Sequence, residues 1–221
     1  MRSGERTGPT APPSAATDRW DALAAVYRVQ EPLEARSLAV LLDALTVRAE
    51  EAVLDVGTGT GAVPRALARR GRPAEATTVA VDSSPRMLAL AARVAGVETR
   101  QGDATGLPVP TGSVDVATAA WLLHVLPAPD RVRAVAELVR VLRPGGRLGL
   151  VVPAAPRSPG QRLLRAAALR AAGGLGAFRV PEDLPALLAD HGLRVRRHRR
   201  TGLGYLADVV VCTREPGRGV G

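Results

Sequence analysis

The sequence predicts a doubly wound α/β domain, in which a mostly parallel sheet of seven strands carries helices on both faces. Short apolar runs, typical of buried parallel strands, alternate along the chain with segments of helical periodicity. A glycine-rich turn follows the first apolar run, and the residues TGLG at 201–204 separate two further runs near the end. The alternation indicates right-handed crossovers between parallel strands, whereas the late hairpin signal predicts an antiparallel last strand.

The elements expected for the parallel part of the sheet come first in the chain. Apolar residues at helical spacing predict two helices before the first strand, from Asp18 to Tyr27 and from Glu31 to Leu45. Ser84 and Pro85 supply an N-cap and a first-turn proline for a later helix. The predicted strands span 52–56, 77–82, 97–103, 114–120 and 147–152, and the helices among them span 60–70, 84–94 and 129–142.

The last third of the chain is less regular. A helix over 160–172 and the glycine-rich residues 173–178 are expected to lie over the carboxyl edge of the sheet, and a short helix over 181–190 ends before Gly192. Strands over 193–200 and 205–212 complete the sheet. Strict alternation along the first of these strands predicts arginines on both faces, which suits a solvated edge strand. One expected face holds Leu193, Val195, Arg197 and Arg199, and the other holds Arg194, Arg196, His198 and Arg200.

We therefore expect one domain over 18–214, with an N-terminal helical cap (18–49) and a small lid (154–180). Residues 1–17 are expected to form a disordered leader and 215–221 a flexible tail. No stretch of eighteen residues lacks both charge and proline, and no apolar segment follows a basic start. Neither a transmembrane helix nor a secretory signal is therefore predicted, and the protein is expected to be cytoplasmic, as a monomer or homodimer.

The amino-acid composition disfavours several classes of function. The net charge is +9, yet lysine, isoleucine and asparagine are absent while arginine, alanine, glycine and proline abound, a pattern typical of a very GC-rich, bacterial genome. The basic charge is therefore discounted as a sign of nucleic-acid binding, and the aromatic content of 2% leaves few stacking platforms for single strands. The single cysteine, Cys212, lies in an apolar run and cannot form an internal disulfide, and no metal site is predicted.

The most informative segment is VLDVGTGTG at 53–61, where glycines follow a predicted strand and open a helix. Gly57, Gly59 and Ala62 fit a dinucleotide-binding spacing, with Asp82 about twenty residues further on. Asp55, however, would oppose a pyrophosphate, and Asp103 ends the next strand. Three carboxylates around one crevice suit a ligand that carries a cation, a ribose diol and an adenine amine but no phosphate.

This pattern resembles the class I S-adenosylmethionine-dependent methyltransferases, particularly the group of the ubiquinone and menaquinone biosynthesis methyltransferases. The similarity runs from about residue 20 to 150, and its order and spacing are specific. The resemblance implies a Rossmann-like fold, S-adenosylmethionine as cofactor and S-adenosylhomocysteine as product. The matching segments are WDALAAVY (20–27), VLDVGTGTG (53–61), VAVDSSPRML (79–88), QGDATGLPVPTGSVDVATAAWLLHVLP (101–127) and ELVRVLRPGGRLGL (137–150).

The resemblance also implies roles for individual residues. Asp55 would orient the turn and receive the amino group, Asp82 would bind the ribose hydroxyls, and Asp103 would accept from the adenine amine. The implied cofactor residues are Tyr27, Asp55, Gly57, Thr58, Gly59, Gly61, Asp82, Ser83, Met87, Gly102, Asp103, Ala104, Ala119 and Ala120. The implied substrate pocket holds Trp20, Trp121, His124 and Tyr205.

Each of these residues also has a structural interpretation. Asp82 and Asp103 could be helix or turn caps, Met87 could be ordinary core, and Trp121 could be a packing residue. His124 is the candidate general base, although a histidine between apolar residues is more often structural. Methyl transfer is an in-line displacement that requires alignment of the acceptor rather than an enzyme nucleophile, in agreement with the absence of a triad from the sequence.

The hypothesis that we favour is a methyltransferase for a small molecule in bacterial specialised or quinone-type metabolism. The residues after the fourth predicted strand, TAAWLLHVLP, lack the Asn or Asp-Pro-Pro-aromatic segment of nucleic-acid amine methyltransferases. Three alternatives stay open: the same cofactor in a non-methylating reaction such as cyclisation, a nicotinamide-dependent oxidoreductase, and a non-enzymatic binding protein. The absence of lysine, and with it of a Tyr-x-x-x-Lys motif, disfavours the oxidoreductase.

Overall fold

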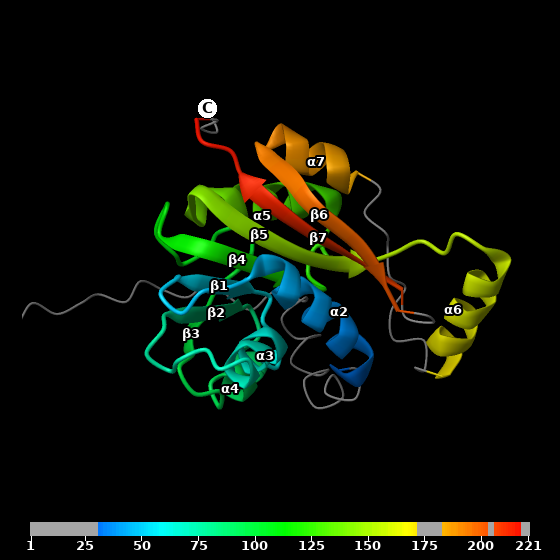
Figure 1. Cartoon of the computed structure of the whole chain (residues 1–221), viewed down its shortest axis with the longest axis horizontal. Helices are drawn as coiled ribbons and strands as arrows, with labels where there is room; N and C mark the ends of the chain where they lie inside the picture. Colours follow the sequence, from blue (N-terminus) through cyan, green and yellow to red (C-terminus); the bar gives the residue numbers. More distant parts are fainter. Residues whose placement is uncertain (1–30, 172–182, 203–205, 218–221) are drawn as a thin grey trace, which may run out of the picture.

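Seven strands form a single sheet in the order β3-β2-β1-β4-β5-β7-β6 in the computed structural model, which describes residues 31–171, 183–202 and 206–217 (Figure 1). The strands β1 to β5 pair in parallel, and β7 lies antiparallel between β5 and β6. The prediction of a mostly parallel, seven-stranded sheet with an antiparallel last strand is confirmed. The bounds are β1 (Val53–Val56), β2 (Thr78–Asp82), β3 (Glu98–Gln101), β4 (Val114–Ala120), β5 (Leu142–Pro153), β6 (Leu193–Thr201) and β7 (Ala207–Arg214).

Helices accompany the strands where helical periodicity predicts them within the described residues. The Ser84 hydroxyl accepts a hydrogen bond from the backbone N–H of Met87 at 3.1 Å, so the predicted N-cap forms. The first predicted helix (18–27), the leader (1–17) and the glycine-rich residues 173–178 lie outside the described residues. The bounds are α2 (Glu31–Leu45), α3 (Ala62–Arg69), α4 (Pro85–Ala91), α5 (Ala128–Val141), α6 (Pro159–Ala171) and α7 (Leu184–Asp190).

Both faces of the sheet are covered because the direction of the crossovers reverses at its centre. The connections from β1 through β3 run one way along the sheet, and the connection from β4 to β5 runs the other way. Since parallel crossovers are right-handed, α3 and α4 lie on one face and α5 on the other. Leucines of α2 and α3 accordingly form one apolar core, and residues of α5 and α7 form the second. Among the helices of the described ranges, none is both long and apolar enough to span a bilayer.

The connection from β3 to β4 contains no helix and is fastened to α5 instead. Glu137 accepts a hydrogen bond from the backbone N–H of Leu107 at 2.6 Å. Arg140 donates to the carbonyl oxygens of Leu107 and Val109 at 3.1 and 3.0 Å, and it pairs with Glu137 at 2.6 Å. These charged contacts fasten the connection to the last turn of α5 without the packing that a helix would provide.

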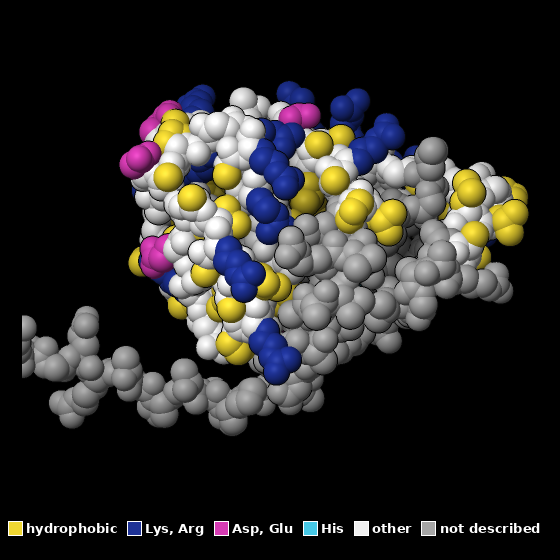
Figure 2. All heavy atoms as spheres, turned by 90° about the horizontal axis from the view of Figure 1, so that it is seen from below, with side chains coloured by type: hydrophobic (Ala, Val, Ile, Leu, Met, Phe, Trp, Pro, Cys, Tyr) yellow, Lys and Arg dark blue, Asp and Glu magenta, His cyan; other side chains and the backbone are white. Residues whose placement is uncertain are grey.

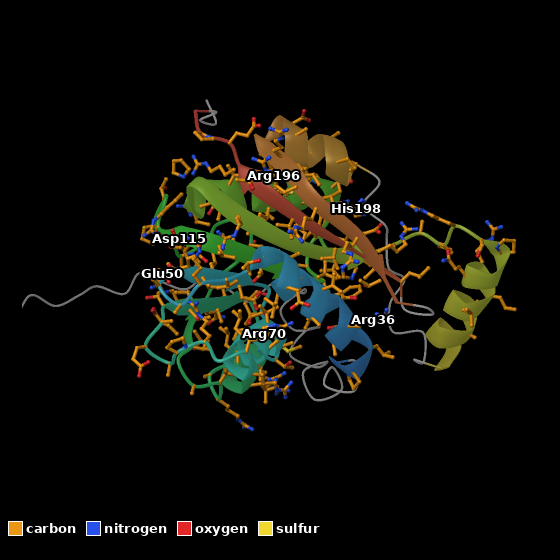
Figure 3. All side chains as sticks on the ribbon, viewed as in Figure 1. Arg36, Glu50, Arg70, Asp115, Arg196 and His198 are labelled. Atoms are coloured by element: carbon orange, nitrogen blue, oxygen red, sulfur yellow. The ribbon has the colours of Figure 1, made fainter. Side chains whose placement is uncertain are left out.

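The strand β6 forms one edge of the sheet, and its side chains depart from the predicted alternation. Val195 pairs with Cys212, but Arg197 pairs with Val211, so a bulge at Arg196 shifts the register by one residue. After the bulge, His198 and Arg200 share a face with Leu193 and Val195, which corrects the predicted assignment of Arg197 and Arg199 to that face. Arg196 and His198 are labelled on this strand in Figure 3. A bulged, arginine-rich edge resists pairing with other chains.

A partly buried ion pair ties the end of α2 to the sheet. Arg147 of β5 donates to both carboxylate oxygens of Glu51, at 3.0 and 2.7 Å, and to the carbonyl oxygen of Leu45, the last residue of α2, at 3.0 Å. The backbone N–H of Arg48 donates to Glu51 as well, at 2.8 Å. Burial raises the pKa of Glu51, but the hydrogen bonds from Arg147 and Arg48 outweigh it and leave the pKa below its ordinary value.

We expect Glu51→Gln to lower the free energy of unfolding by about 2 kcal/mol at neutral pH, because a hydrogen-bonded charge with little exposure loses its partner. Since the folded-state pKa is lowered, the contribution of Glu51 is present above its ordinary pKa and is lost as the pH falls through the folded value. Urea unfolding at neutral and acidic pH measures both effects. The neighbouring exposed Glu50, labelled in Figure 3, provides the matched control Glu50→Gln, and an equal loss in both variants would contradict the assignment.

Candidate functional site

A pocket of about 520 Å³ lies at the carboxyl ends of β1, β2 and β4. The connections that leave β1 and β4 run in opposite directions along the sheet, so a gap opens above the ends of these two adjacent strands. In open α/β sheets, this reversal of strand order is where ligands bind. The position of the pocket therefore follows from the strand order and does not depend on a particular side chain.

The glycine-rich turn after β1 forms one wall of the pocket. Gly57, Gly59 and Gly61 have φ values of 67°, 53° and 83°, in the left-handed region that favours glycine. A Cβ atom on Gly59 would meet no atom within 4 Å, so this backbone is open to close approach by a ligand. A Cβ on Gly61 would lie 3.0 Å from the Cα of Ala91 in α4, and Gly61 does not line the pocket. Gly61 therefore permits helix packing, whereas Gly59 faces the pocket.

Asp82, the last residue of β2, joins this turn to the start of α4. Its Oδ2 accepts a hydrogen bond from the N–H of Gly59 at 2.8 Å, and its Oδ1 accepts one from the N–H of Ser84 at 2.9 Å. Asp82 also lines the pocket. The capping and binding interpretations of this residue are compatible, because each carboxylate oxygen has a second lone pair.

Asp55 is the most deeply buried carboxylate of the pocket, with 2% of its surface exposed. Burial raises its pKa to about 6, although hydrogen bonding, chiefly from the Thr118 hydroxyl, opposes the rise. Thr118 lies directly beside Asp55 in the adjacent strand β4, and its hydroxyl donates to Oδ1 at 2.6 Å. The sequence interpretation missed Thr118, whose signal is a hydroxyl residue among the alanines at the end of the strand.

Asp103 forms the far end of the pocket and also caps its own turn. Its Oδ1 accepts hydrogen bonds from the N–H and the hydroxyl of Thr105, at 2.8 and 2.6 Å. A Cβ on the preceding Gly102 would lie 2.5 Å from Pro108, so only glycine fits at this position. Ser83, Met87, Gly102 and Ala104 line the pocket together with Asp103, as does Thr58 from the glycine-rich turn.

The end of β4 supplies an apolar wall. Ala120 and Trp121 line the pocket, whereas Ala119 does not. Trp121 has a positive φ of 60° and is 6% exposed, and its backbone N–H donates to Val151 at 2.8 Å. The left-handed backbone at Trp121 ends the strand and directs the chain across the pocket. Trp121 also belongs to the apolar core, so it both packs and lines the pocket, whereas its role toward a substrate stays a prediction.

His124 lies outside the pocket lining, behind Trp121. Its ring meets the Trp121 ring edge to face, with the centroids 6.1 Å apart. The side chain is 6% exposed, and burial together with the positive charge of Arg131 lowers its pKa to about 4. His124 is therefore neutral at physiological pH. Its side chain is not among the described residues that line the pocket. Trp20, Tyr27 and Tyr205 lie outside the described residues.

Two groups of lining residues were not anticipated. One is Glu34 and Leu38 of α2; the other is at the start of α5 and just before it, where Asp130 and Arg133 form an ion pair. Among the described lining residues, Arg133 is the single basic side chain, against five carboxylates. The pocket therefore favours a cationic ligand. The carboxylates are Glu34, Asp55, Asp82, Asp103 and Asp130; the other new lining residues before α5 are Leu122, Val125, Leu126 and Pro127.

Comparison with known proteins gives consistent results. Residues 53–146 match a family described as a methyltransferase domain. The demethylmenaquinone methyltransferase of Thermus thermophilus is 34% identical over 203 residues, which cover 80% of this chain and 89% of that protein. An uncharacterized methyltransferase of Mycobacterium tuberculosis is 41% identical over 111 residues, 50% of this chain, and the match spans less than half (43%) of that relative.

The fold recurs among solved structures. One chain from the complex between the Haloferax volcanii Trm112 methyltransferase activator and a methyltransferase superposes with a TM-score of 0.74. The match covers 93% of this chain and 100% of that chain, at 18% sequence identity. At this identity the similarity concerns the fold.

We expect Asp55→Asn to become more stable relative to the wild type as the pH rises. Because burial raises the pKa of Asp55 to about 6, its favourable contribution is complete below the ordinary value of 3.8 and is lost as the pH rises through about 6. Asparagine cannot ionise, so the difference in free energy of unfolding should shift toward the variant by up to about 3 kcal/mol across this range.

Denaturant unfolding of both proteins without ligand, at pH values on either side of this range, measures the shift. The exposed residue Asp190 provides the control variant Asp190→Asn. A pH-independent difference for Asp55→Asn would show that the Asp55 carboxyl titrates like an exposed one.

Proposed function

The chain belongs to the S-adenosylmethionine-dependent methyltransferase family, and from this premise we propose that it transfers the methyl group of S-adenosylmethionine to a small-molecule acceptor. The observation that carries the proposal is the charge of the pocket, in which carboxylates at three adjacent strand ends surround an open glycine backbone. S-adenosylmethionine is a cation with a ribose diol, an adenine amine and no phosphate, and these features match that donor set.

In this proposal, each carboxylate of the pocket binds a different part of the cofactor. Asp82 would accept hydrogen bonds from the ribose hydroxyls, and Asp103 would accept one from the adenine amine. Asp55 would stabilise the positive charge of the amino acid part. The proposed cofactor site also includes Gly57, Thr58, Gly59, Ser83, Met87, Gly102, Ala104 and Ala120, each of which lines the pocket.

The same charges disfavour the dinucleotide alternative. A pyrophosphate beside the glycine-rich turn would approach both Asp55 and Asp82, and like charges repel strongly where water is excluded. Arg133, the single basic side chain of the described lining, is already paired with Asp130. The described part of the lining thus offers no unpaired cation that would compensate a phosphate at the turn.

The sulfonium of the bound cofactor supplies an electrophilic methyl group, and the protein has to align the acceptor with it and exclude water. Leu38 and Trp121, both buried, line the pocket from α2 and the end of β4 and would shield the reacting groups. No side chain has to act as a nucleophile. The hypothesis that His124 accepts a proton receives no support from its position behind Trp121.

The acceptor that we favour is a largely apolar small molecule, such as a quinone-type or specialised metabolite. The residues between β4 and α5 contribute an apolar wall to the pocket, formed by Leu122, Val125 and Leu126. The Thermus thermophilus relative, which this chain spans almost completely, is named a demethylmenaquinone methyltransferase. A quinone precursor is therefore the first acceptor to test.

Incubation of the protein with methyl-labelled S-adenosylmethionine and a bacterial metabolite extract tests the reaction. Label should move to a small organic product, with S-adenosylhomocysteine formed in equal amount. Turnover of extract components without label transfer would favour a non-methylating reaction instead. Absence of both, in a protein that binds the cofactor, would favour a binding function.

We expect Asp82→Ala to weaken S-adenosylmethionine binding by about 1.5–3 kcal/mol, since the variant removes a carboxylate that would accept hydrogen bonds from the ribose hydroxyls. Titration calorimetry measures the affinity, and NAD serves as the comparison ligand. Asp190→Ala, at an exposed position on α7, is the matched control and should bind as the wild type does. Tight binding of NAD by the wild type, without detectable binding of either adenosyl ligand, would refute the cofactor proposal.

A further inference from the structure

Helix α6 forms by its own local interactions. The Ser158 hydroxyl accepts a hydrogen bond from the N–H of Gln161 at 3.2 Å, and the Gln161 side chain accepts one from the N–H of Arg157 at 2.7 Å. Pro159 occupies the first turn, where it lacks only an N–H that the helix does not need. These reciprocal contacts resemble a capping box, so the helix begins at a position set by sequence.

The leucines of α6 are exposed to an unusual degree. Leu163 is 72% exposed and Leu164 is 52% exposed. Figure 1 draws α6 to one side of the domain, and Figure 2 shows hydrophobic side chains gathered at that end of the molecule. A helix that leaves large apolar side chains in water indicates a surface that contacts something else.

The chain around α6 is also basic. Residues 154–181 contain five arginines and no aspartate or glutamate. A GC-rich genome explains arginine in place of lysine, but it does not explain the absence of acidic residues from twenty-eight consecutive positions. An amphipathic, basic and acid-free helix is typical of segments that lie on anionic membranes.

The chain that leads from β5 to α6 is attached to β6 and to the residues just before β7. After β5, the N–H of Ala154 donates to Leu206 at 3.0 Å, and Arg200 of β6 donates to the carbonyl oxygen of Ala155 at 2.9 Å. The segment therefore leaves from the end of β5, beside β6 and β7 and at the same carboxyl edge of the sheet as the pocket. The exposed Arg197 and Arg199 of β6 extend the basic surface next to this attachment.

We propose that α6 docks on the surface of an anionic lipid bilayer, with Leu163 and Leu164 entering the headgroup region and the exposed Arg157 and Arg162 meeting lipid phosphates. The helix has thirteen residues, too few to cross the roughly 30 Å hydrocarbon core, so it would lie on the membrane. Given the proposed function, this contact would bring the pocket close to acceptors that partition into lipid. The docking itself does not depend on catalysis.

Sedimentation of the full-length protein with vesicles tests the proposal at physiological salt. The protein should bind vesicles that contain phosphatidylcholine and phosphatidylglycerol in a 3:1 ratio, and it should bind pure phosphatidylcholine vesicles at least tenfold more weakly. Leu163→Ser/Leu164→Ser should reduce binding to the anionic vesicles at least fivefold. The matched control replaces two exposed apolar residues elsewhere, Leu33→Ser/Val132→Ser, and should bind as the wild type does.

Three results would overturn the proposal. Absence of vesicle binding by the wild type would refute membrane docking. If the Leu163→Ser/Leu164→Ser variant bound anionic vesicles as tightly as the wild type, the binding would come from net charge alone. If that variant instead lost self-association or acceptor affinity while its vesicle binding was unchanged, α6 would be a contact between copies or a cover for the pocket. Calorimetry with S-adenosylmethionine, run on the same proteins, reports separately on the proposed function.

Discussion

The carboxylate of Asp82 connects the two strand ends on which the pocket depends. One oxygen holds the N–H of Gly59 in the turn after β1, and the other holds the N–H of Ser84 before α4. The turn is thereby fixed with its glycine backbone open to the pocket, and Gly61, at the end of the turn, packs against Ala91, the last residue of α4. A single side chain at the end of β2 thus couples the backbone conformation of the site to the packing of the helices.

The pocket is electrostatically unfavourable until a cation enters it. Asp55 is buried beside Thr118, and both burial and the charge of Asp82 raise its pKa. A positively charged ligand would offset the cost of burying the Asp55 carboxylate near Asp82, because both carboxylates would attract the ligand. Such a site costs stability in the free protein and contributes selectivity in the complex, a compromise that is common at binding sites.

Elsewhere in the domain, arginine side chains stabilise the packing of neighbouring elements. Arg147 holds the end of α2 through Glu51, and Arg140 holds the helix-free connection after β3 through Glu137. Both arginines also donate to backbone carbonyl oxygens that are not paired within a helix or strand. In a chain without lysine, the planar guanidinium group serves these multiple contacts well, since it presents five donors in a fixed geometry.

The sequence by itself determined the order of the elements, the mostly parallel sheet and the glycine-rich turn between carboxylates. These features follow from hydrophobic periodicity and from the handedness of crossovers, which are local or topological. Asp55, Asp82 and Asp103 could be placed together for the same reason, because residues that end parallel strands meet at one edge.

Only the tertiary structure decided which helical residues reach the pocket. Glu34 enters from α2 and Asp130 from α5, whereas His124 turns behind Trp121. The bulge at Arg196 likewise reverses the faces of the residues after it. These outcomes depend on how far each helix is rotated against the sheet and on a one-residue shift in strand register. Both are set by packing and pairing between segments distant in sequence, which residue spacing along the chain does not encode.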